Sequence, residues 1–167
     1  MDLTVINGLP AHVLLVHAVV VLIPLTAIAL AICALWTSWA KRLGLALPAL
    51  GLITLAFVPL TAHAGEWLEQ HVDSDPLVRR HTELGDGLLP WALGMFLVSV
   101  LLWWRSRRSA AADSHPSRLG LGFRTAAVAV SLAVGAGAVV QTYRIGESGA
   151  KAAWHDGFSA TATGTKG

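Results

Sequence analysis

Seven histidines are the side chains of this chain whose chemistry most needs an explanation. His17 comes first, because it lies about one turn inside the apolar run Val13–Trp36, where Thr26 is the only other clearly polar residue. An ionisable side chain within a membrane-spanning segment is costly, so its presence predicts a functional site. A neutral imidazole can bind iron, copper or zinc, and it can also transfer a proton.

Two more histidines are placed to approach His17. His63 closes the second apolar run and has Glu66 one turn beyond it, and His81 precedes the third run. Helix bundles build haem and metal sites from side chains on facing helices. Two imidazoles among His17, His63 and His81 would supply the axial ligands of a haem b that transfers single electrons. The set His17, His63, Glu66 and His81 would instead suit one Fe, Cu or Zn ion.

A third interpretation requires no cofactor. Histidine has an apolar body and a polar tip, so it is tolerated at the boundary between lipid and water. His12, which precedes the first run, and His71 and His155 are weaker ligand candidates for this reason. The chain would then be a structural or accessory subunit of a membrane complex. The sequence assigns no enzyme activity.

The composition indicates a protein of the membrane. Hydrophobic residues make up 54% of the chain and charged residues 13%, whereas soluble domains carry about 25% charged residues. In lipid each spanning segment must satisfy its own backbone hydrogen bonds and is therefore helical. We expect an all-α, four-helix transmembrane bundle in a multi-pass cell-membrane protein with no nucleic-acid partner. The four apolar runs are Val13–Trp36, Leu43–Thr61, Leu88–Trp104 and Thr125–Tyr143.

The helix boundaries follow from capping and glycine signals. We expect one integral domain over residues 9–156, with helices over about 10–39, 43–70, 76–105 and 122–145, and a disordered tail over 157–167. Asp75-Pro76 reads as an N-cap followed by proline at the first helical position, which turns His81 towards the bundle. The glycines of Gly146–Lys151 predict an end to the fourth helix, after which Trp154 folds back.

The basic residues predict the orientation of the bundle. Cytoplasmic loops are enriched in lysine and arginine. The first and third connections are basic, so we expect them to be cytoplasmic, with both termini and six histidines on the extracytoplasmic side. The second connection, expected outside, carries the acids Glu66, Glu69, Asp73, Asp75, Glu83 and Asp86.

Several stretches resemble a known family. They are Leu9–His17 leading into a run with Pro24, the pair His63 and Glu66, Arg80-His81, and Tyr143–Trp154. Over roughly residues 8–154 the chain resembles the bacterial membrane family called domain of unknown function 2231, which implies an integral four-helix protein without an established activity. The architecture is also similar to that of cytochrome b561-type electron carriers, an analogy that transfers no residue roles.

The haem interpretation has consequences for partners. A single haem at one side of the bilayer cannot carry electrons across it alone. We therefore expect either another membrane redox subunit or an extracytoplasmic electron partner, in addition to the lipid bilayer. A second copy of the chain is a further candidate, because it would contribute a second cofactor.

Overall fold

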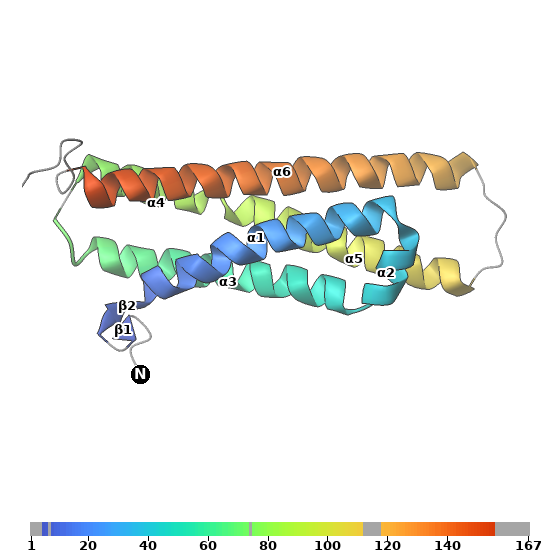
Figure 1. Cartoon of the computed structure of the whole chain (residues 1–167), viewed down its shortest axis with the longest axis horizontal. Coiled ribbons are helices and arrows are strands. Elements are labelled where there is room, and N and C mark those ends of the chain that lie inside the picture. The colour runs from blue at the N-terminus through green and yellow to red at the C-terminus, as the bar shows by residue number, and fades with distance from the viewer. Residues whose placement is uncertain (1–4, 7, 74, 112–117, 156–167) are drawn as a thin grey trace, which may run out of the picture.

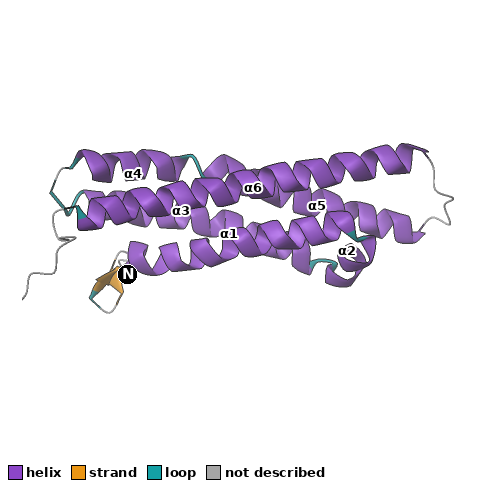
Figure 2. Cartoon of the chain, turned by 45° about the horizontal axis from the view of Figure 1, so that its top comes forward, coloured by secondary structure: helices purple, strands orange, loops and turns teal. Residues whose placement is uncertain are grey.

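The computed structural model describes residues 5–6, 8–73, 75–111 and 118–155, and almost all of them are helical. A short antiparallel pair, β1 (Val5–Ile6) and β2 (Leu9–Pro10), precedes the helices. The long helices run side by side along one axis, with α4 following the same axis at one end (Figures 1 and 2). The helices are α1 (Ala11–Leu35), α2 (Thr37–Leu43), α3 (Ala46–Glu69), α4 (Pro76–Asp86), α5 (Leu89–Ala111) and α6 (Arg118–Trp154).

The structure confirms the four-helix transmembrane bundle. Four helical stretches are long and apolar enough to cross a membrane, and large apolar side chains such as Val21, Leu97 and Val140 are exposed on their surfaces. Exposed apolar surface of this kind suits lipid, not water. The chain is thus a multi-pass membrane protein. The stretches are Ala11–Leu35, Ala46–Glu69, Pro76–Arg108 and Gly122–Trp154.

Several helix boundaries differ from those expected. Trp36 has an extended backbone (φ −124°, ψ 104°) and separates α1 from α2. The turn at Gly87–Leu88 separates α4 from α5. The predicted break in the fourth helix is wrong, because α6 continues through Gly146 to Trp154. Glycine inside a helix costs only about 1 kcal/mol relative to alanine, which tertiary packing can offset. The tail over 157–167 lies outside the described residues.

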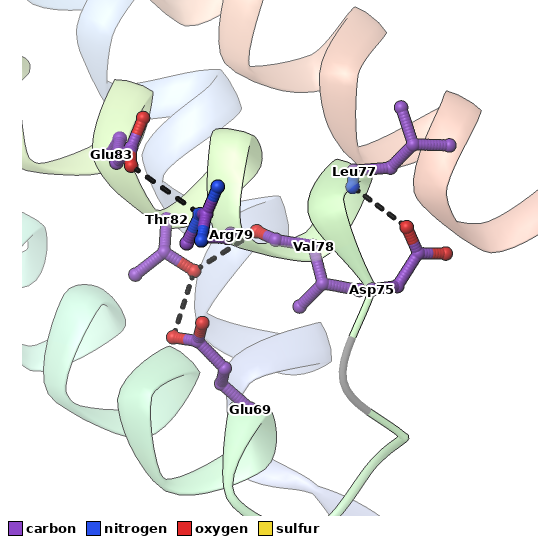
Figure 3. A network of polar contacts seen from close by, with 7 residues as sticks. All are labelled: Glu69, Asp75, Leu77, Val78, Arg79, Thr82 and Glu83. Atoms are coloured by element: carbon purple, nitrogen blue, oxygen red, sulfur yellow. Dashed lines mark hydrogen bonds and ion pairs between the residues drawn. The ribbon is translucent and has the colours of Figure 1, made fainter.

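The start of α4 is as predicted. Asp75 Oδ1 accepts a 2.7 Å hydrogen bond from the main-chain N–H of Leu77, and Pro76 occupies the first helical position (Figure 3). The cap satisfies an N–H that has no partner within the helix. It therefore fixes where α4 begins, and with it which face carries His81.

Small and hydroxyl-bearing side chains allow the helices to approach closely. A Cβ on Gly51 of α3 would lie 2.7 Å from Ser99 Oγ and 3.2 Å from Phe96 Cα on α5. The buried hydroxyls of Thr26 on α1 and Thr54 on α3 lie 2.8 Å apart. In lipid, where no hydrophobic effect drives helices together, such close packing and interhelical hydrogen bonds hold the bundle.

The described acidic side chains gather at one end of the bundle. Every described Asp and Glu lies near the end formed by the start of α1, the end of α3, α4 and the end of α6, here named the acidic end (Figure 1). At the opposite, basic end, Arg108 lies 3.8 Å above the ring of Trp104 and Arg105 lies 4.0 Å above that of Phe123. That the basic end faces the cytoplasm stays a prediction of the positive-inside rule.

The contact at Gly51 yields a test of the packing. Gly51→Val should destabilise the bundle by about 1–3 kcal/mol, because the new side chain must displace Ser99 or the α5 backbone. Reversible unfolding in detergent would measure the loss. The control is Gly122→Val, since nothing lies within 4 Å of a Cβ at Gly122. Equal stability of the two variants would contradict the close approach of α3 and α5.

Candidate functional site

A cavity lies between α1, α3, α4 and α6 at the acidic end. Its volume is about 750 Å³, within the range of about 300–1,000 Å³ that small-molecule and cofactor sites occupy. Most of its wall is apolar, and the polar groups are histidines, carboxylates and threonine hydroxyls. Apolar wall residues include Val16, Val19, Val58, Leu68, Val78 and Ile145.

Two histidines from different helices meet in this cavity. His12 from α1 and His81 from α4 have ring centroids 6.1 Å apart and ring planes at 85° to each other. Both side chains are half-buried. His81 therefore faces the bundle as predicted, but its neighbour is His12, which was ranked from the sequence as a weaker ligand candidate.

The ring of His12 is held by α3. Its Nδ1 lies 2.9 Å from the carbonyl oxygen of Thr61. A carbonyl oxygen only accepts hydrogen bonds, so Nδ1 carries the hydrogen and Nε2 of the neutral ring keeps a lone pair. A Cβ on Gly65 would lie only 3.0 Å from Cε1 and from Nδ1 of this ring. The ring thus rests directly on the α3 backbone.

The ring of His81 is held by α6 in the same manner. Its Nδ1 lies 3.1 Å from the carbonyl oxygen of Ile145 and 3.0 Å from Ser148 Oγ. The Ser148 hydroxyl itself donates to the Ile145 carbonyl over 2.8 Å. A Cβ on Gly149 would lie 2.9 Å from Cε1 of the ring.

One local pattern therefore occurs on both α3 and α6. On α3 the acceptor carbonyl of Thr61 lies four residues before Gly65. On α6 the acceptor carbonyl of Ile145 lies four residues before Gly149. In an α-helix the residue at i+4 lies directly beyond the carbonyl of residue i. A glycine there removes the side chain that would cover the carbonyl, so an imidazole can reach it. Gly149 belongs to Gly146–Lys151, the stretch predicted to end the fourth helix.

The other predicted ligands lie elsewhere. His17 is exposed at the edge of the cavity, and its Nδ1 lies 2.6 Å from the Val13 carbonyl oxygen. The side chain of His63 is 82% exposed, does not line the cavity, and lies 3.6 Å from Glu66 through Nδ1 and Oε2. The set of His17, His63, Glu66 and His81 is thus not brought together, and no group of three or more metal-ligating side chains occurs among the described residues.

Helical periodicity could have identified His12. It shares a helix face with Val16, Val19 and Ile23, at i, i+4, i+7 and i+11, and the last two are buried. His17 lies on the same face of α1 as Val13, and this face remains exposed in the next turn of the helix. His17 was predicted as a ligand because it lies deep in the apolar run. Whether a histidine enters the bundle depends instead on the helix face that carries it.

Carboxylates give the cavity a negative field. Glu69 accepts a 3.1 Å hydrogen bond from Thr82, and Asp75 Oδ2 lies 3.5 Å from His155 Nε2; Figure 3 shows the Glu69 contact beside the Asp75 cap. Asp73 and Asp86 also line the wall, while none of the described lining residues is lysine or arginine. Such a lining attracts cations and repels anions.

The tautomers of the histidine pair are a direct test of this geometry. At about pH 8, where imidazole is neutral, His12 and His81 should both carry their hydrogen on Nδ1. Nitrogen-15 NMR of histidine-labelled protein distinguishes the two ring nitrogens, and His12→Gln and His81→Gln would assign the signals. A hydrogen on Nε2 of either ring would contradict the bonds to Thr61 and Ile145.

Comparison with known proteins identifies the family. The model of a family described as "Predicted membrane protein (DUF2231)" matches residues 8–162, which include all four spanning helices. No curated protein and no solved structure matches the chain, so the similarity to cytochrome b561-type carriers has no support from a match. By the extent of the family match, the chain belongs to the DUF2231 family of predicted membrane proteins.

Proposed function

We propose that the chain is a membrane electron carrier that binds haem b between His12 and His81. The observation that carries this proposal is the state of the two rings: each Nδ1 donates to a main-chain carbonyl, so both Nε2 atoms keep their lone pairs. Proteins orient metal-binding histidines in this way, with the second nitrogen held by a carbonyl or a carboxylate. Bound haem would supply one-electron chemistry.

The spacing of the rings supports ligation by both. A metal–imidazole bond is about 2 Å long, so two imidazoles that hold one metal would have ring centroids no more than roughly 6 Å apart. The observed separation is 6.1 Å. The residues of the chain would bind and orient the group, and the apolar wall would exclude water from it. An electron partner, either a membrane redox subunit or a soluble protein, would approach at the acidic end.

The carboxylates favour a second candidate, a single Fe, Cu or Zn ion. Haem carries two anionic propionates, and no described lysine or arginine in the cavity wall would neutralise them. Glu69, Asp73, Asp75 and Asp86 would instead attract a cation to the histidine pair. Two imidazoles would then be the protein ligands, with water completing the coordination, since no third ligating side chain is grouped with them in the described structure.

An absorption spectrum of the purified protein tests the haem proposal. We expect a Soret band, with α and β bands that sharpen when dithionite is added. His12→Ala and His81→Ala should each abolish this spectrum because each removes one of the two imidazoles that would hold the haem. The matched controls are His17→Ala and His63→Ala, which remove exposed histidines and should leave the spectrum unchanged. A spectrum that survives loss of both His12 and His81 would refute ligation by this pair.

Metal analysis of the same samples tests the ion. A colourless protein with about one Fe, Cu or Zn ion per chain, lost in His12→Ala and His81→Ala and removed by a chelator, would favour it. His17→Ala and His63→Ala again serve as controls. A colourless, metal-free protein from cells supplied with haem and metals would contradict both candidates. The chain would then be treated as a structural or accessory subunit.

A further inference from the structure

The cavity extends to the surface of the bundle along the seam between α1 and α6. These two helices diverge towards the acidic end (Figure 1). On each helix the residues that line the cavity at the seam are spaced i, i+4 and i+7, and all six are exposed. They are Val13, His17 and Val20 on α1, and Gly146, Ala150 and Ala153 on α6.

This opening, here named the portal, lies between two helices that are long and apolar enough to cross a membrane. All six of its residues lie within the spanning stretches of α1 and α6. Glycine and alanine on α6 leave room between the helices, and the valines on α1 make the opposite wall apolar. A ligand that enters the portal from the hydrocarbon layer would have to be soluble in lipid.

His17 supplies the one ionisable group of the portal. Because its Nδ1 hydrogen is donated to the Val13 carbonyl, its neutral Nε2 can only accept a hydrogen bond. Within the described part of the chain, no side chain or carbonyl satisfies this Nε2. A ligand that matches it must donate a hydrogen bond, and a neutral ligand avoids repulsion by the carboxylates of the cavity.

We propose that the portal binds a lipid-soluble hydroquinone, whose hydroxyl donates to Nε2 of His17 while its ring lies between Val13, Val20 and Ala150. This inference rests on the proposed electron-carrier function, which requires an electron donor. A hydroquinone combines a hydroxyl donor, a flat ring and an isoprenoid tail that remains in the bilayer. Its oxidation to the quinone would release two electrons and two protons. The single cofactor of the proposed function would have to accept the electrons one at a time, with re-oxidation by the electron partner in between, and the carboxylates of the cavity would accept the protons.

The redox form of the ligand gives the sharpest test. A quinone has only acceptor oxygens and cannot bond to an acceptor Nε2. Ubiquinol-1 and ubiquinone-1 would be titrated anaerobically into the full chain in nanodiscs, with binding measured by calorimetry. The hydroquinone should bind about 2- to 10-fold more tightly than the quinone, the worth of one hydrogen bond. Equal affinity for the two forms would overturn the proposal.

Variants locate the site. His17→Leu should remove the preference for the hydroquinone, and His17→Gln, which restores an acceptor oxygen, should recover part of it. Ala150→Trp should abolish binding by filling the portal, whereas Ala136→Trp, an exposed position of α6 outside the cavity, should not. Binding that survives Ala150→Trp would place the ligand elsewhere and overturn the assignment.

Spectra of the same samples separate the two proposals. A coloured or metal-bound protein that binds neither redox form would overturn the portal site and leave the cofactor proposal standing. A colourless, metal-free protein that binds the hydroquinone with the predicted preference, lost in His17→Leu, would overturn the cofactor and support the portal.

Discussion

The acidic end depends on one type of bond, from an imidazole Nδ1 to a main-chain carbonyl oxygen. His12 makes it to α3, His81 makes it to α6, and His17 makes it within its own helix. A helix carbonyl that accepts a main-chain hydrogen bond can accept a further one, and the carbonyl of Ile145 is approached by both the Ser148 hydroxyl and His81. The bonds of His12 and His81 join neighbouring helices without any charged group. They also fix the tautomer of each ring, so the side of the imidazole that can meet a ligand is set by the backbone.

The glycines determine where such bonds can form. Gly65 and Gly149 each uncover the carbonyl one turn before them and let an imidazole rest on the helix. The helix loses a small amount of stability at each glycine, because glycine has a low intrinsic helix propensity. Elsewhere the same absence of a side chain serves packing, as at Gly135, where a Cβ would lie 3.1 Å from Ala27 Cβ. Small residues thus have two roles in this bundle, close helix contact and access to the main chain.

The sequence predicted the bundle, its four spans and the start of α4, because length, hydropathy and the Asp75-Pro76 cap are local signals. It also predicted that His81 faces inward. The sequence did not predict the pairing of His81 with His12, because that contact depends on how α1 and α4 lie against each other. Local rules also do not show that α6 continues through Gly146 and Gly149. Gly149 packs against the ring of His81, which comes from a distant part of the chain.

The bond between His81 and the Ile145 carbonyl joins residues separated by 64 positions, and its acceptor lies in the last helix. During synthesis α1, α3 and α4 are therefore complete before the groups that hold His81 have been made. The cavity closes only when the end of α6 has been inserted and has docked. The ring of His81 therefore takes the orientation described above only when the last helix is in place, so a ligand that needs both rings could be held only by the finished bundle.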